Sequence, residues 1–390
     1  MNQMVFEGRA LTGIVSSIIR QDTMKVPLNR LDWERIFRLA DYHKVANIVH
    51  LGILGYRESL PDKWRERFFE RYQEALQYGE NYKESVKEVL TWLDARKISC
   101  TILMSETVRE YYPIPETAAN SSLQLLLNQE NFTLVKGYLV DMGYETDRVY
   151  EGVGERLSRL NSISVLLCYK LPFRTARYER DMRRLLETAM LRESYQYIRT
   201  LTLEGELIFR LAGAAYRYVT DELTMREVLD LQLCHRTWRD HVRLDAVGRR
   251  LEDFQVEQLA EKILRISYMW FGDKKDTYYE HLPDDMPAFD RLEERLLTRG
   301  IVNHEADEQA LRLQKMIQKE LDKEKRAEER QQFREKLKER HEQLKRRIRW
   351  IFPDYHYMSS IYPRVEKLPV LLPVYWVIRG IRLLMRTLSG

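Results

Sequence analysis

The chain has 390 residues, 44% of them apolar and 32% charged, which is enough to bury a full core in one or two domains and is typical of a strongly helical protein. Its net charge of +4 is unevenly divided: from residue 311 onwards there are 20 Lys and Arg against 10 Asp and Glu, so this region carries +10 and the rest −6. The three cysteines are far apart and lack metal-binding spacing, which excludes a zinc site of the usual kind and predicts reduced, buried thiols.

Residues 1–99 are predicted to form an N-terminal helical region. The apolar residues of LDWERIFRLADYHKVANIVHLGILGYR fall largely at helical spacing, and Pro61 is suited to the first turn of a further helix. The first ten residues contain an acid and no long apolar run, so we expect no signal peptide.

The pattern changes between residues 100 and 172. Short apolar runs of strand length occur in CTILM, SLQLLL and ISVLLCY, and the proline-punctuated segment YYPIPET separates the first two. Residues 128 to 142 return to a helical period, and Gly143 is placed to end that helix. Gly152-Val153-Gly154 lacks the third glycine of a phosphate-binding motif and predicts a turn. We therefore expect residues 100–172 to form a small mixed α/β unit inside a mostly helical α+β protein.

The remaining chain divides into four predicted parts: a helical domain over 173–272 with helices from about 179 to 271, a linker over 273–304, a long charged helix over 305–350 and a basic tail over 351–390. The tail ends in an amphipathic helix with Arg379, Arg382 and Arg386 on one face. Two prolines and three arginines argue against a membrane span there. We favour docking of this helix on the protein's own body, and anchoring at a membrane interface is the alternative.

The order of these segments resembles the bacterial uncharacterised nucleotidyltransferase family, a branch of the polymerase-β-like superfamily. The family's first strand, short helix and Tyr-Pro are matched by TILMSETVREYYP. Its second strand and a helix ending in Gly-Tyr are matched by SLQLLLNQENFTLVKGYLVDMGYE, and its last strand by SVLLCYKLP. LADYHKVANIVH with His43, and LTMREVLDL with Arg226 and Asp230, are similar to its flanking helices. IFPDYHYMSSIYPRVEKLPVLLPVYWVIRGIR resembles a tail found in many members. The resemblance covers nearly the whole chain.

The resemblance implies a site for nucleotidyl transfer, in which carboxylates hold two divalent ions that activate the attacking oxygen and neutralise the triphosphate. The positions it assigns to the functional groups hold other residues: Met104 and Ser105 for a Lys-Gly pair, Ser122 and Gln124 for two strand aspartates, Leu166 for a third carboxylate and Cys168 for the histidine beside it. Ser122 and Gln124 keep the alternate spacing that places two side chains on one face of a strand, but they supply no negative charge.

Nearby residues offer two substitutes for the missing groups. Glu106, Glu110 and Glu116 lie close in sequence, although solvated surface acids are the commoner explanation. Ser105 could give a hydroxyl and a backbone N–H to a phosphate, but a serine at the end of a strand is also an ordinary helix N-cap, which we favour.

The sequence therefore favours a nucleotidyltransferase-like pseudoenzyme with a binding or assembly role and with no metal or other cofactor. The first alternative is an active enzyme that transfers a nucleoside monophosphate from an NTP, with Mg²⁺ held by relocated ligands. The second is a protein that binds nucleic acid or a membrane surface through its basic C-terminal region. We expect a protein partner or a membrane surface to engage residues 305–390, a nucleotide as a possible ligand, and a cytoplasmic location with peripheral contact to the inner membrane face.

Overall fold

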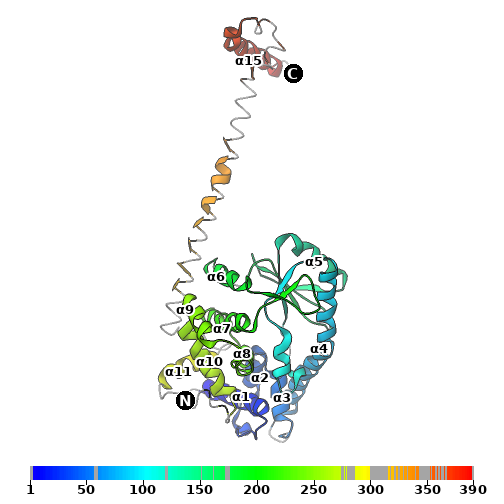
Figure 1. Ribbon diagram of the computed structural model, residues 1–390, viewed down its shortest axis with the longest axis vertical. Helices are drawn as coiled ribbons and strands as arrows, with labels where there is room; N and C mark the ends of the chain where they lie inside the picture. The colour runs from blue at the N-terminus through cyan, green and yellow to red at the C-terminus, as the bar shows by residue number, and fades with distance from the viewer. Residues whose placement is uncertain are drawn as a thin grey trace. The chain divides into compact units, whose positions relative to one another are not determined.

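The computed structural model places the chain in two compact units, Met1–Glu320 and Leu321–Gly390. It describes all residues except 1–2, 57–59, 119–121, 151, 161, 172–175, 274–275, 277, 279–285, 299–314, 317, 320–321, 324–325, 328, 332, 339, 342–351, 353, 356–357, 359–360, 362–363, 365–366 and 389–390. Most of the described residues are helical and their strands form one mixed sheet, so the predicted α+β, mostly helical class is confirmed (Figure 1).

The first unit begins with helices, as predicted: α1 (Gln3–Arg20), α2 (Trp33–Tyr42), α3 (Ala46–Ile53) and α4 (Asp62–Ala95), with a 3-10 turn, η1 (Leu28–Arg30), after α1. Asp32 caps α2, because its carboxylate accepts hydrogen bonds from the backbone N–H groups of Glu34 and Arg35. Pro61 immediately precedes α4. Helices α1 and α3 pack closely at Gly52, where an added Cβ would lie 2.6 Å from Ile14 Cγ2.

The sheet contains seven strands: β1 (Cys100–Ile102), β2 (Leu123–Leu127), β3 (Glu145–Tyr150), β4 (Gly154–Ser158), β5 (Val165–Cys168), β6 (Met190–Leu191) and β7 (Ile198–Thr200). Their order is β3-β4-β5-β2-β1-β7-β6. The pairs β2–β5 and β1–β7 are parallel, and the other neighbours are antiparallel. The predicted turn at Gly152 is confirmed, since it joins β3 to β4 with a φ of +71° at that glycine.

Two strands lie where the sequence predicted only helices. Strands β6 and β7 interrupt the region from about 179 to 271, so the helical prediction was wrong there. They have two and three residues, too few for a periodic pattern, and β7 is held in the sheet by pairing with β1.

One face of the sheet is covered by α4 and by α5 (Gln129–Asp141), as Figure 1 shows. Alternate residues of β2 enter this core with apolar residues of both helices: Leu123, Leu125, Leu127, Val86, Leu90, Val135 and Leu139. Helix α5 ends as predicted at Gly143, which has a φ of +84°. The Gly143 N–H donates to the Val140 carbonyl and the Tyr144 N–H to the Leu139 carbonyl, the pair of bonds that closes a glycine-terminated helix.

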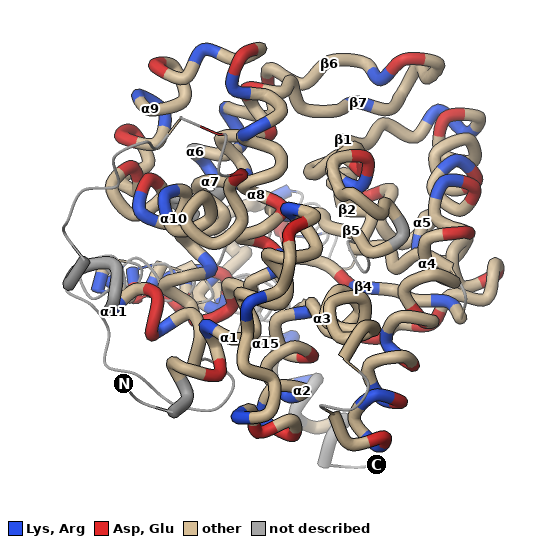
Figure 2. The backbone as a smooth tube through the Cα atoms, turned by 90° about the horizontal axis from the view of Figure 1, so that it is seen from below, with Lys and Arg blue, Asp and Glu red and all other residues tan. Residues whose placement is uncertain are grey.

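Helices dominate the rest of the first unit: α6 (Ala176–Leu186), α7 (Leu203–Val219), α8 (Met225–Trp238), α9 (Leu244–Asp253), α10 (Glu257–Phe271) and α11 (Met286–Leu297). The side chains of Thr224 and Glu227 form a reciprocal capping box at the start of α8. Helix α7 is buried along most of its length, whereas charged residues of both signs lie along outer helices such as α4 and α9 (Figure 2). Cys100, Cys168 and Cys234 are free and buried, as predicted, and burial raises the pKa of Cys100 and Cys168 to about 12.

In the second unit, every described residue from 322 to 341 is helical, within the segment predicted as a long charged helix. A 3-10 turn, η6 (Pro369–Leu371), leads into α15 (Leu372–Leu388). The Trp376 ring packs edge-on against Phe352, with 5.3 Å between ring centroids. Among the described residues of the chain, no helix combines the length and apolar character needed to cross a membrane.

Candidate functional site

The positions assigned to the strand carboxylates lie together on the face of the sheet opposite the Leu123–Leu125–Leu127 core. Along β2, buried and half-buried residues alternate, and Gln124 is on the half-buried side. In the parallel pairing of β2 with β5, Gln124 lies directly opposite Leu166. Ser122 is two residues before Gln124 and therefore faces the same side of the sheet. The three residues Ser122, Gln124 and Leu166 therefore form one patch, which we call the open-face patch. The neighbouring residues Asn120 and Ser121 lie outside the described residues.

The open-face patch offers poor ligands for divalent ions. The Ser122 hydroxyl is hydrogen-bonded to the Ser164 hydroxyl at 2.7 Å, Gln124 supplies a neutral amide and Leu166 supplies no polar atom. On β4, the residue opposite Leu166 is Arg156, whose guanidinium makes two hydrogen bonds, of 2.7 and 2.9 Å, to the Asp147 carboxylate. A pair of Mg²⁺ ions requires hard anionic oxygens, so these side chains do not fit the metals that nucleotidyl transfer would use.

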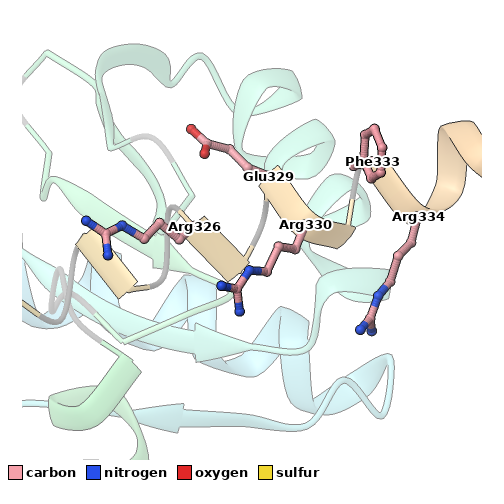
Figure 3. A pocket seen from close by; sticks show the side chains of 5 residues that line it. All are labelled: Arg326, Glu329, Arg330, Phe333 and Arg334. Carbon is pink, nitrogen blue, oxygen red and sulfur yellow. The ribbon is translucent and has the colours of Figure 1, made fainter.

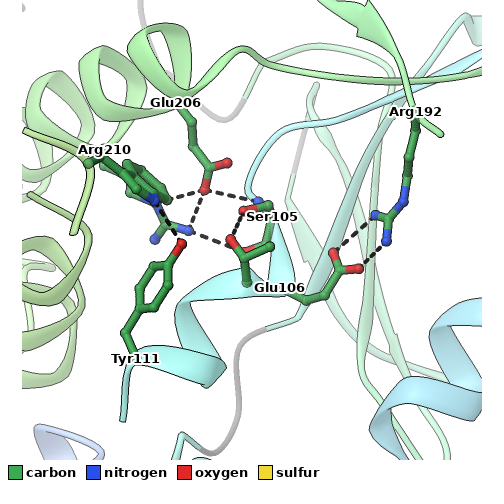
Figure 4. Close-up of polar contacts among 8 residues, drawn as sticks. Ser105, Glu106, Tyr111, Arg192, Glu206 and Arg210 are labelled. Atoms are coloured by element: carbon green, nitrogen blue, oxygen red, sulfur yellow. Dashed lines mark hydrogen bonds and ion pairs between the residues drawn. The ribbon is translucent and has the colours of Figure 1, made fainter. Parts of the chain in front are cut away.

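The loop after β1 is tied to α7 (Figure 4). The Ser105 backbone N–H donates to Glu206 Oε1 at 3.0 Å, and the Ser105 carbonyl accepts from Arg210 at 3.3 Å. The Ser105 hydroxyl is hydrogen-bonded to the Thr107 hydroxyl at 2.7 Å. Ser105 occupies the N-cap position of the 3-10 helix η3 (Glu106–Tyr111), but its side chain makes no capping bond. Its N–H and hydroxyl, the two groups considered for phosphate binding, therefore have partners within the protein.

Glu206 and Arg210 form a buried ion pair one turn apart on α7. Arg210 Nε lies 2.8 Å from Glu206 Oε1, and the two side chains are 6% and 3% exposed. The Arg210 guanidinium also lies over the ring of Trp238, whose indole N–H donates to the Tyr111 hydroxyl at 2.8 Å. Through these contacts, α7 and α8 hold both ends of η3 and fix the loop that begins at Ser105.

Glu106 and Glu110, two of the acids considered as substitute metal ligands, each lie near a cation. Glu106 forms a two-pronged ion pair with Arg192, which follows β6 (Figure 4). Although burial favours the protonated form, the hydrogen bonds and charge of Arg192 outweigh it and hold the pKa of Glu106 below its ordinary value. Glu110 lies 3.5 Å from Lys83. The side chain of Glu116 is outside the described residues.

The flanking segments singled out in the sequence meet beside this loop. His43 Nδ1 accepts a hydrogen bond from the Met225 N–H at 3.1 Å. Arg226 donates to the Lys44 carbonyl and to Asn47 Oδ1, at 3.0 and 2.8 Å. These bonds join the start of α8 to the corner between α2 and α3.

Asp230, one turn after Arg226, accepts a hydrogen bond from the Tyr112 hydroxyl. Burial raises the pKa of Asp230, although the charge of Arg226 and the bond from Tyr112 oppose that shift. The polar groups of this junction are thus bonded to other residues of the chain, and they position the Tyr-Pro segment against α8.

Sequence reasoning missed Arg192, Glu206 and Arg210. The contacts of Ser105 with Glu206 and of Glu106 with Arg192 join residues 101 and 86 positions apart, so no local sequence pattern predicts them. One signal was present in LEGELIFRLAGAAYR: an acid and a base spaced four residues apart in a helix that is otherwise mostly apolar.

The hollows found elsewhere do not coincide with the open-face patch. One, of about 230 Å³, lies between α3 and α4 and is lined by His50, Ile53, Leu54, Arg65, Glu66 and Phe69. Another, of about 320 Å³, is lined, among the described residues, by five side chains of one helical segment in the second unit: Arg326, Glu329, Arg330, Phe333 and Arg334 (Figure 3). A hollow on a single helix face lacks the enclosing walls that small-molecule sites have.

The strands β1, β2 and β5 and helix α5 follow one another in the order that the sequence resemblance to nucleotidyltransferases predicts. The family model described as "Uncharacterised nucleotidyltransferase" matches residues 29–272, well over half of the chain. The chain therefore belongs to the uncharacterised nucleotidyltransferase family. Neither the curated proteins nor the solved structures contain a match to it.

Proposed function

We propose that this chain is a member of the nucleotidyltransferase family that has lost metal-dependent catalysis and keeps the fold for binding or assembly. The observation that carries the proposal is the open-face patch: Ser122, Gln124 and Leu166 stand side by side, in register, without a carboxylate among them. The three buried, free thiols favour a reducing compartment, so we further propose that the protein acts in the cytoplasm.

The absence of carboxylates should greatly weaken the affinity of the open-face patch for divalent ions. Two unit charges about 4 Å apart interact by roughly 4 kcal/mol at an effective dielectric of about 20. Replacing even two carboxylates by neutral groups should therefore weaken capture of a divalent ion by orders of magnitude. Arg156, opposite Leu166 on β4, is itself paired with Asp147 and supplies no ligand for a cation.

The competing proposal is an active enzyme with Mg²⁺ and NTP bound by relocated acids. Glu106 and Glu110 are the two described acids that the sequence offered as substitutes, and each already lies next to a cation. To bind a metal, Glu106 would have to give up its bonds to Arg192, and the free energy of that pair would be subtracted from the metal affinity. This cost favours the pseudoenzyme over the enzyme.

The test is isothermal titration of the full chain with each NTP, with and without Mg²⁺ and Mn²⁺. We expect either no binding or binding that is indifferent to the metal. Micromolar binding that requires the metal would refute the pseudoenzyme and support the relocated site, and its loss in Glu106→Gln would identify the ligand.

A variant with the acids restored, Ser122→Asp/Gln124→Asp/Leu166→Glu, provides the matched positive control. Because the open-face positions are already adjacent on β2 and β5, this variant should acquire affinity for Mn²⁺ that the unaltered chain lacks. Its thermal transition with and without Mn²⁺ would report that affinity independently of any nucleotide, since a ligand that binds only the folded state raises the transition temperature.

A further inference from the structure

Helix α15 exposes a continuous apolar stripe. Its members recur at positions i, i+3, i+4, i+7 and i+11 along one side of the helix, and each is 36–62% exposed: Val374, Val377, Ile378, Ile381 and Met385. Val370, in the turn before the helix, extends the stripe and is 87% exposed. Scattered exposed apolar residues are normal on a protein surface, but an aligned row of this length marks an interaction surface.

The stripe is not the side by which α15 packs in its own unit. Leu372 and Trp376 lie on the opposite side of the helix and are half-buried, and Trp376 packs against Phe352. Internal packing therefore already uses one side of α15, and the apolar stripe is a second, separate surface.

A row of arginines lies between the stripe and the packing side of α15, and the first of them, Arg379, is half-buried three residues after Trp376. Arg379, Arg382 and Arg386 are spaced three and four residues apart and so share one side of the helix. No Asp or Glu follows Glu366, so the last 24 residues carry four positive charges, including Lys367, and no negative one. The surface that complements this helix is apolar and anionic at once.

We propose that α15 binds the surface of a membrane that contains anionic lipid. The helix would lie in the plane of the interface, with the Val374–Met385 stripe among the acyl chains and the arginines at the phosphate headgroups. A convex stripe on a single helix suits the continuous hydrocarbon of a bilayer, which needs no matching groove. The proposal is independent of the catalytic state of the nucleotidyltransferase fold.

The experiment is co-sedimentation of the full chain with vesicles of phosphatidylcholine alone and of phosphatidylcholine with about one third phosphatidylglycerol, at low and high salt. We expect binding to the anionic vesicles, weaker binding at high salt and little binding to the neutral ones. Equal binding to both vesicles, or no binding to either, would overturn the proposal.

Paired variants separate the two features of the helix. Arg379→Gln/Arg382→Gln should weaken binding roughly 30-fold, because each cation near an anionic surface contributes about a fivefold factor. Val377→Ser/Ile381→Ser should weaken it at least about tenfold by removing buried aliphatic groups. The control is Leu134→Ser/Val140→Ser on α5, whose side chains are 52% and 49% exposed, and it should bind as the unaltered chain does.

The other occupants of the stripe give distinct results. If α15 docks on the chain's own body, or on a second copy of the chain, Val377→Ser/Ile381→Ser will change the hydrodynamic radius or the unfolding transition without lipid, and binding to vesicles will be absent. That result would refute a membrane partner. Circular dichroism of each variant would confirm that the exposed substitutions leave the helix content unchanged.

Discussion

The buried pair Glu206–Arg210 gives the sharpest test of how the loop after β1 is held. Replacing Glu206 with Met leaves the Arg210 guanidinium, in a side chain 6% exposed, without its counter-charge and leaves the Ser105 N–H without its acceptor. Removing one partner of a buried ion pair costs about 3–5 kcal/mol. We therefore expect Glu206→Met to lower the free energy of unfolding of the first unit by about 4 kcal/mol.

The double variant Glu206→Met/Arg210→Met should recover much of that loss. Two apolar side chains of similar length leave no buried charge, and such replacements are often neutral or stabilising. The coupling between the two positions should therefore reach at least about 2 kcal/mol in a double-mutant cycle. Urea unfolding followed by tryptophan fluorescence suits the measurement, since Arg210 lies over the Trp238 ring.

A control and a contrary outcome complete this test. Arg249→Met breaks an ion pair with Asp245 in which both side chains are more than 70% exposed, so it should change the free energy of unfolding by less than about 1 kcal/mol. If the two single losses at Glu206 and Arg210 simply add up to the loss in the double variant, the pair is not coupled and the assigned role of Glu206 is wrong.

Three further predictions concern glycine and pH. Gly154→Ala should destabilise the first unit by roughly 2–3 kcal/mol, because the new Cβ would lie 1.9 Å from the Leu167 carbonyl oxygen. Gly137→Ala, with open space around it, should stabilise α5 by about 0.5–1 kcal/mol. Urea unfolding of the two variants makes the comparison, and equal effects on stability would contradict the crowding at Gly154. Burial lowers the pKa of His235 from 6.5 to about 4, so protonation favours the unfolded chain as the pH falls through this window. Stability should then drop by about 3 kcal/mol between pH 6.5 and 4, and His235→Gln, followed by urea unfolding across that range, should remove most of this slope. Because the pKa of Glu106 is lowered in the folded chain, this group stabilises the fold above its unfolded pKa, near 4.5, and the stabilisation is lost as the pH falls through the folded pKa. The difference in unfolding free energy between the unaltered chain and Glu106→Gln should therefore shrink in acid. A constant difference down to pH 3 would argue against the pair with Arg192.

The sequence predicted those parts of the fold that repeat a local pattern. Helical spacing identified α2, α4 and α5, a run of leucines identified β2, and Gly143 marked the end of α5. The hairpin β3–β4 was not predicted, because β3 is an edge strand with mostly exposed, polar residues and has no apolar run to detect. Strands β6 and β7 were not predicted either, because tertiary pairing, rather than intrinsic propensity, makes them strands.

The candidate site shows the same division between local and long-range information. The alternation along β2 predicted that Ser122 and Gln124 share a face, and the structure adds that Leu166 lies directly opposite Gln124. The contacts that engage Ser105 and Glu106 depend on how α7 and the segment after β6 fold back onto the loop, which single-sequence periodicity does not encode.

The two faces of β2 separate the residues that fix the strand from the residues of the open-face patch. Leu123, Leu125 and Leu127 set the register of the strand by burial, so the register does not depend on the residues that point the other way. Carboxylates at directly opposed positions would repel each other unless a cation lay between them. With Gln124 and Leu166 there, the sheet needs no ion to neutralise its open face. The register of β2 is therefore compatible with the proposed retention of the scaffold without metal-dependent catalysis.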